Sequence, residues 1–208
     1  MIALYAVAVF GFAAPPAEVH AAAAPYDIQA GYDGWRATKK LGPQPLACEV
    51  LWTGHAQLCF RWRADGKRQW ATRDDLTTWT TSTVALRSAA TAGSAAWVAN
   101  ETEWVAVSDL DGRYLRLRDG DGRAVLGALA PEALEAAVGS PLAVAIPSTG
   151  VLLAWKAGDR DFDHAMVVGV RELHDQARDP VTAVAFRWIG GEWVPWVEAT
   201  HQEKTPSD

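Results

Sequence analysis

Two apolar runs separated by a short turn dominate the pattern of hydrophobic and polar positions in this chain. The runs, Pro141 to Ile146 and Val151 to Trp155, are continuous rather than alternating, which is typical of strands covered on both faces. The next segment begins at Asp161, a natural N-cap, and carries apolar residues three and four positions apart. We therefore predict two buried strands followed by a helix with one face on a sheet. Its apolar positions are Phe162, Ala165, Met166, Val168, Gly169, Val170 and Leu173.

The other elements follow from the same kind of pattern. Residues 72 to 92 have helical spacing after a capping Thr, and Pro131 opens a short helix that ends before Gly139. The remaining segments favour hairpins at about 95 to 108 and 181 to 197, and a strand at Arg113 to Arg118. The order predicts an α+β fold with a mainly antiparallel sheet, hairpins and two main helices packed on the sheet.

The two cysteines face each other in the first predicted hairpin. If Thr53 and Gly54 form a two-residue turn, Cys48 lies directly opposite Cys59. Opposed residues of an antiparallel pair are close enough for a disulfide, and such a bond fits an oxidising compartment. We predict this disulfide; the alternative is two buried free thiols in a cytosolic protein.

Eleven tryptophans are an unusual content for 208 residues. Counting outward from a predicted turn in the same way places three pairs of tryptophans opposite each other: Trp62 with Trp70, Trp97 with Trp104, and Trp188 with Trp193. Cross-strand aromatic pairs stabilise hairpins, which is one interpretation of this content. The other is an exposed platform for a carbohydrate, a peptide or a partner protein. Trp188, Trp193 and Trp196 are the candidate binding residues for it.

The N-terminus indicates export. Residues 2 to 14 are apolar but too few to span a membrane, and Val19-His20-Ala21 fits a signal-peptide cleavage site, although the usual basic start is missing. We predict a signal peptide at 1–21, a linker or wrapping arm at 22–45, a single α+β domain at 46–200 and a disordered tail at 201–208. No transmembrane segment is expected after cleavage. The alternative is an N-terminal element buried in a cytoplasmic protein.

Charge and motifs argue against several functions. The net charge is −6 and no window concentrates Lys and Arg, so a nucleic-acid partner is not expected. The chain has no P-loop and no Gly-rich dinucleotide motif, and its cysteines lack the spacing of a zinc site. We therefore expect neither a cofactor nor a metal.

Asp159, Asp161 and Asp163 form a D-x-D-x-D run like the start of a calcium loop. The sixth position is His164 instead of Gly and the twelfth is Val170 instead of Glu, so the run is interpreted as a strand-to-helix turn. His164 and His174 are ten positions apart on the predicted helix, too far to bind one metal together. No complete catalytic constellation is present, and the catalytic residues, if any, are unknown.

The second half of the chain resembles the DUF1444 group of uncharacterised bacterial proteins over about residues 75–190. The matching features are Trp79, Leu86 and Ala89 in a helix, the segment Leu129 to Leu134, and Pro141 to Leu153 with its proline turn. Thr149 stands where a charged residue is expected in that turn. The resemblance implies an α/β or α+β fold and a bacterial origin, with no activity to carry over.

These observations predict an exported, periplasmic or secreted bacterial protein. Its activity is unknown, and we expect a non-catalytic binding module of the cell envelope with a protein or glycan partner. The alternative is a small hydrolase or other small-molecule enzyme with its site near Asp159 to His164.

Overall fold

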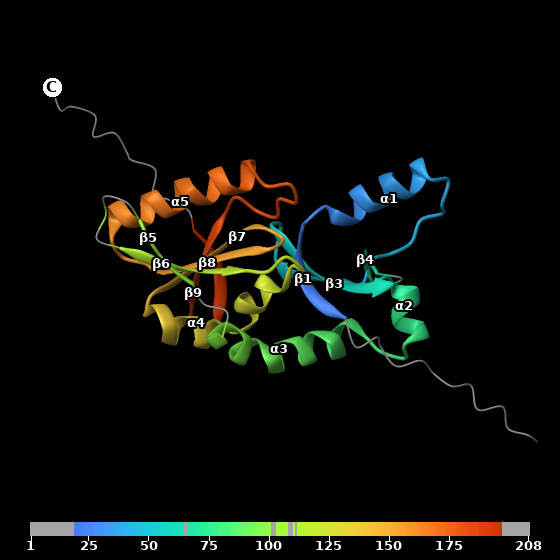
Figure 1. Cartoon of the computed structure of the whole chain (residues 1–208), viewed down its shortest axis with the longest axis horizontal. Coiled ribbons are helices and arrows are strands. Elements are labelled where there is room, and N and C mark those ends of the chain that lie inside the picture. Colours follow the sequence, from blue (N-terminus) through green and yellow to red (C-terminus); the bar gives the residue numbers. More distant parts are fainter. Residues whose placement is uncertain (1–18, 65, 101–102, 108–109, 111, 197–208) are drawn as a thin grey trace, which may run out of the picture.

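Two antiparallel sheets form the framework of the protein (Figure 1). A computed structural model describes residues 19–64, 66–100, 103–107, 110 and 112–196. The first sheet has the order β1-β3-β2. Strand β4 pairs with the same edge of β3 as β2 does, further along that strand. The second has the order β10-β9-β7-β8-β6-β5. The first sheet consists of β1 (His20–Pro25), β2 (Cys48–Trp52), β3 (Ala56–Ala64) and β4 (Lys67–Trp70). The second consists of β5 (Glu103–Ala106), β6 (Arg113–Arg118), β7 (Leu142–Ser148), β8 (Val151–Lys156), β9 (Ala185–Ile189) and β10 (Glu192–Pro195).

Helices cover both faces of the six-stranded sheet. Helix α5 lies on one face, and α4 and the end of α3 lie on the other (Figure 1). One apolar cluster is shared by the two sheets, and a smaller one lies under α5. The α+β fold with antiparallel sheets is thus confirmed. The helices are α1 (Ile28–Thr38), α2 (Arg73–Thr78), α3 (Thr83–Asn100), the 3-10 helix η1 (Arg123–Leu129), α4 (Pro131–Val138) and α5 (Arg160–Asp175).

The two apolar runs form the central strands β7 and β8, as predicted. Val144 and Ala154 face the cluster shared by the sheets, whereas Ala143 and Trp155 face the cluster under α5. Both faces are therefore covered, which explains why these strands do not alternate between apolar and polar residues. The cap of α5 lies two residues earlier than predicted, because the carboxylate of Asp159 accepts the backbone N–H groups of Asp161 and Phe162.

The segment 72–100 differs from the prediction. Instead of one helix at 72–92, α2 and α3 are separated at 79–82, where Thr80 has a positive φ of 50°. Thr72 and Asp75 form a capping box for α2, and the hydroxyl of Ser82 accepts the N–H of Ala85 at the start of α3. Since α3 continues to Asn100, the predicted hairpin at 95–108 and the Trp97–Trp104 pair are wrong.

The predicted pairing of Trp62 with Trp70 is also wrong, by one position. Ala64 pairs with Lys67, so Trp70 lies opposite Arg61 and Trp62 opposite Gln69. A two-residue connection replaces the three-residue turn assumed from the sequence, and a shift of one residue moves a side chain to the other face. The guanidinium of Arg61 instead lies over the ring of Trp70, 3.9 Å from its centroid.

The expected linker at 22–45 contains regular structure. Strand β1 pairs with β3 along its whole length, Ala21 to Ala24 are buried, and α1 follows it. A run of alanines has no strand signature in sequence, yet small side chains fit between covered faces. The predicted cleavage after Ala21 would fall inside β1. Residues 1–18 and the predicted tail at 201–208 lie outside the described residues. In the part of the chain that is described, no helix is long and apolar enough to cross a membrane.

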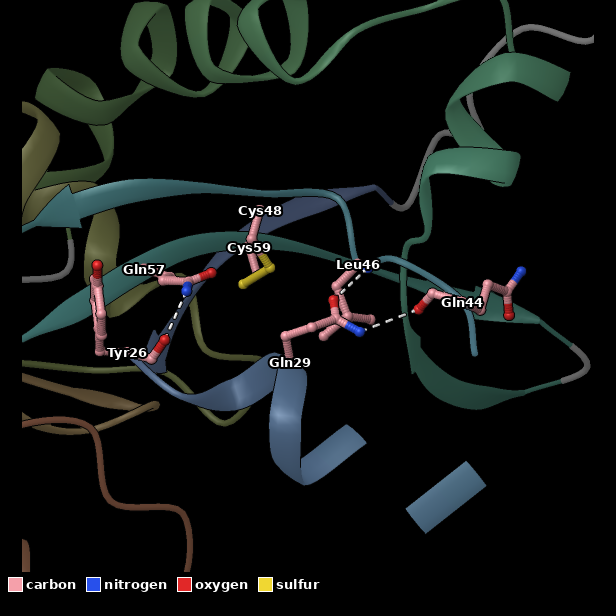
Figure 2. The surroundings of a disulfide bond; sticks show 7 residues. All are labelled: Tyr26, Gln29, Gln44, Leu46, Cys48, Gln57 and Cys59. Carbon is pink, nitrogen blue, oxygen red and sulfur yellow. Dashed lines mark hydrogen bonds between the residues drawn. A yellow bond between two sulfur atoms is a disulfide. The ribbon is translucent and has the colours of Figure 1, made fainter. Parts of the chain in front are cut away.

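The disulfide between Cys48 and Cys59 is confirmed, and the two residues are direct cross-strand partners (Figure 2). It closes a loop with a sequence separation of 11. Such a cross-link restricts the unfolded chain, so we expect reduction to lower the free energy of unfolding by about 2–3 kcal/mol. Urea unfolding with and without a phosphine reductant measures this difference. A Cys48→Ala/Cys59→Ala variant should match the reduced protein, and an unchanged midpoint in both would contradict the prediction.

Candidate functional site

An aromatic groove lies where the two sheets meet, and we call it the Trp groove. It has a volume of about 630 Å³. Strands β9 and β10 supply one wall, the end of β2 another, and α3 with the η1–α4 junction close the remaining sides. Its lining includes Trp188, Trp193, Leu51, Trp52, Leu129, Pro131 and Pro195, with the polar residues Thr53, Thr91, Arg87, Glu132 and Glu192.

Trp188 and Trp193 form the aromatic wall of the Trp groove. They are direct partners across the β9–β10 hairpin, as predicted. Their ring centroids are 4.9 Å apart and the planes are inclined by 53°. Both side chains are half-buried. Part of each ring thus packs on the core while part stays accessible, which combines stabilisation of the hairpin with a contact surface.

A second layer of aromatic rings supports this wall. Trp52 lies edge-on to Trp193 at 6.0 Å and stacks on Phe186 at 4.0 Å. Trp52 and Phe186 are 3% and 1% exposed, so they form the floor. The indole N–H of Trp193 donates to the carbonyl of Ala128 at 3.1 Å, which fixes the ring orientation. The groove is therefore preformed, because its rings are held by packing and by a hydrogen bond.

Trp196, the third candidate residue, lies on the opposite face of the same sheet. Its ring packs near Trp155, with centroids 6.2 Å apart, and the guanidinium of Arg187 lies 3.6 Å from its centroid. It belongs to the cluster under α5, whereas Trp188 and Trp193 pack on the shared cluster. The structure therefore brings together two of the three predicted residues. Sequence analysis missed Leu51, Trp52 and Pro131, because their proximity depends on how the two sheets meet.

The rim of the Trp groove is acidic. Glu132 and Glu192 are both exposed. Among the described residues that line the groove, the one cation is Arg87, which makes an ion pair with Glu49 at 3.3 Å. The positive charge is thus already balanced, and the two carboxylates favour a ligand with basic groups.

A second cavity of about 700 Å³ is lined by another side of α3, including Leu86, Ala90 and Trp97. At its polar end Asp121 makes ion pairs with Arg63 at 3.3 Å and Arg68 at 2.6 Å. Desolvation acts to raise the pKa of Asp121, but the charges of Arg68 and Arg63 and the hydrogen bond from Arg63 hold it below its usual value.

The role of this charged cluster is mainly structural. His20 bonds the carbonyl of Asp121 at 2.9 Å, and Arg68 donates to the carbonyl of Gly120 at 2.6 Å. These contacts join the turn at 119–122 to β1 and to the β3–β4 hairpin. The polar groups of this cavity are engaged in holding the two sheets together.

The residues of the alternative enzyme site are also engaged in structure. Asp159 caps α5, and Asp163 is 6% exposed. The carboxylate of Asp163 accepts the indole N–H of Trp155 at 3.0 Å and the backbone N–H of Gly158 at 2.9 Å. His164 lies exposed on the next position of the helix. Among the described residues, no group of three or more His, Cys, Asp or Glu side chains is arranged to hold a metal ion.

Comparisons with protein-family models, with curated proteins and with solved structures found no match to this chain. The resemblance to the DUF1444 group therefore stays a prediction.

Proposed function

We propose that this protein is a non-catalytic binding module of the bacterial cell envelope, and that the Trp groove holds an extended segment of a partner protein. The observation that carries the proposal is the pairing of Trp188 and Trp193, half-buried, in a groove of about 630 Å³. Tryptophan is enriched at the centres of protein interfaces, where it supplies large contact areas.

Two features support a location outside the cytoplasm. The disulfide between Cys48 and Cys59 is typical of proteins in oxidising compartments. The apolar segment at residues 2–14 has the length of a signal-peptide core. Together they are consistent with a periplasmic or secreted protein.

The lining favours a peptide over a glycan. Apolar walls formed by Leu51, Leu129, Pro131 and the two rings lie beside the exposed carboxylates of the rim, and this combination suits a basic peptide better than a neutral sugar. The indole N–H of Trp193 is engaged by Ala128 and is not available to a hydroxyl. Grooves lined by aromatic residues bind proline-rich and other extended peptides. We therefore infer that an apolar side chain of the partner packs on the rings, while a neighbouring basic residue contacts Glu132 or Glu192.

Replacing Trp188 with alanine tests the site. A random peptide library displayed on phage should yield sequences that combine apolar or proline residues with a basic residue. For a synthetic peptide selected in this way, we expect Trp188→Ala to weaken binding by about thirtyfold or more, because truncated aromatic hot spots cost at least about 2 kcal/mol. Fluorescence anisotropy of the labelled peptide measures the Kd.

Trp104→Ala is the matched control. Trp104 is 40% exposed but lies on β5, at the opposite edge of the six-stranded sheet from β10. The Trp104→Ala variant should leave the Kd of the peptide unchanged. The double variant Glu132→Gln/Glu192→Gln should weaken peptide binding at low salt only, because salt screens charges on the surface. Selected peptides whose binding is insensitive to Trp188→Ala would reject the Trp groove. A glycan array signal that depends on Trp188, with no enriched peptide, would reject the peptide assignment and support a sugar ligand.

A further inference from the structure

Residues 26–45 comprise helix α1, the two residues before it and the loop after it, and we call this segment the α1 arm. It lies across the four-stranded sheet from α3 (Figure 1). Figure 1 shows α1 over the four-stranded sheet and away from the six-stranded sheet. All residues of α1 are described, and none of them is buried. Because helices in proteins are stabilised mostly by burying an apolar face, such exposure requires another explanation.

The polar side of α1 makes the contacts that hold the arm in place. The amide of Gln29 donates to the carbonyl of Gln44 at 3.3 Å, and its oxygen accepts the backbone N–H of Leu46 at 2.8 Å (Figure 2). About two turns further along the helix, Arg36 donates to the carbonyl of Gly42 at 2.6 Å and to the side-chain oxygen of Gln44 at 2.8 Å. These polar groups are therefore used within the arm and are not free to bind a ligand.

Apolar and aromatic side chains of the arm stay accessible instead. Trp35 is 52% exposed, and Tyr26 and Leu41 are each 47% exposed. On the helix, the exposed ring of Trp35 stacks on that of Tyr32 with centroids 5.8 Å apart, whereas Tyr32 and Ile28 are themselves half-buried. Tyr and Trp have an apolar ring with a polar tip, the combination enriched at the boundary between lipid and water.

The same end of the arm is basic. Lys39 and Lys40 are adjacent and exposed, and neither makes an ion pair with a described residue, whereas the nearby Arg36 is engaged by Gly42 and Gln44. The chain as a whole has a net charge of −6. Because the rest of the molecule is acidic, Lys39 and Lys40 would orient the C-terminal end of α1 toward a negatively charged surface.

We propose that the α1 arm docks on an anionic lipid bilayer, with Trp35 and Leu41 entering the interface and Lys39 and Lys40 contacting the headgroups. A helix of 11 residues is about 16 Å long. A stable protein interface buries roughly 800 Å² of surface per partner, which is more than the exposed side chains of so short a helix supply. Insertion of aromatic and leucine side chains, together with about 1 kcal/mol from each Lys near an anionic surface, gives weak and reversible membrane binding. This docking is independent of the Trp groove.

Vesicle co-sedimentation of the full chain tests the proposal. One set of vesicles contains phosphatidylcholine alone, and the other contains equal parts of phosphatidylcholine and phosphatidylglycerol. We expect binding to the anionic vesicles only, and we expect added salt to release the protein. Lys39→Gln/Lys40→Gln should lower partitioning by about thirtyfold, since each cation near an anionic surface contributes about 1 kcal/mol. Trp35→Ala should lower it by about tenfold.

Trp104→Ala serves as the control, because Trp104 is an exposed tryptophan of the other sheet. It should bind anionic vesicles like the unmodified protein, and circular dichroism should confirm that all variants are folded. Equal binding to both kinds of vesicle, no binding to either, or an equal loss in Trp35→Ala and Trp104→Ala would overturn the proposal. Self-association that is abolished by Trp35→Ala, without vesicle binding, would assign the arm to a second copy of the chain instead.

Discussion

Replacing Phe186 with alanine is expected to lower the free energy of unfolding by about 3–5 kcal/mol. The side chain is 1% exposed, and its ring stacks on Trp52 with centroids 4.0 Å apart. Truncation therefore removes buried apolar surface and leaves a cavity in the shared core. Because Phe186 belongs to β9 and Trp52 to β2, the cavity opens between the two sheets.

The way in which Phe186→Ala unfolds tests the prediction of a single domain. If one core joins the sheets, urea unfolding followed by tryptophan fluorescence and by far-UV circular dichroism should give one coincident transition at a lower midpoint. Ile189→Ala is the matched control, since Ile189 lies on the same strand but is 52% exposed. It should change stability by about 0.5 kcal/mol or less. Two separated transitions, or equal losses in both variants, would contradict a shared core.

Local patterns predicted the elements that are covered on both faces or closed by short turns. Strands β7 and β8 were predicted from their continuous apolar runs, because a buried strand needs apolar residues at every position. The Trp188–Trp193 pair followed from a two-residue turn, since such a turn fixes the register of the whole hairpin. The Cys48–Cys59 pair was also predicted correctly, but the turn assumed for it was wrong: three residues separate Trp52 from its partner Ala56, and a bulge between Val50 and Trp52 compensates for the extra residue. In these segments local sequence and tertiary packing favour the same structure.

Other elements depended on information that is not local. The run Ala21 to Ala24 has poor strand propensity and forms β1 only because β3 pairs along it. Trp97 was placed in a hairpin from an apparent partner at Trp104, but the alanines around it favour a helix. The pairing of Trp62 with Trp70 failed because the length of the turn was misjudged by one residue.

The candidate site was predicted in part. Trp188 and Trp193 line the Trp groove, but Trp196 does not, and strand geometry gives the reason. Successive side chains of a strand point to opposite faces, so residues three positions apart, such as Trp193 and Trp196, lie on different sides. This separation could have been recognised from the sequence. The contribution of Trp52 could not, because it requires the relative placement of two sheets.

Asp163→Ala is expected to lower the free energy of unfolding by about 2–4 kcal/mol, because it leaves two donors without an acceptor. Those donors are the indole N–H of Trp155, 0% exposed, and the backbone N–H of Gly158. Asp163→Asn should have an intermediate effect, because the amide oxygen can accept only one of the two donors while the amide N–H₂ faces the other. Thermal and urea unfolding measure both variants.

Asp161→Ala is the matched control, since this carboxylate lies in the same first turn of α5 but is exposed. It loses only a favourable charge at the helix N-terminus, which contributes about 0.3–1 kcal/mol. The order of stability should therefore be Asp161→Ala, then Asp163→Asn, then Asp163→Ala. A structural role requires this order, because it depends on how many buried donors keep an acceptor. If Asp163→Ala were as stable as Asp161→Ala, the buried carboxylate would not be holding β8 to α5, and the alternative of an acid–base role at this turn would gain support.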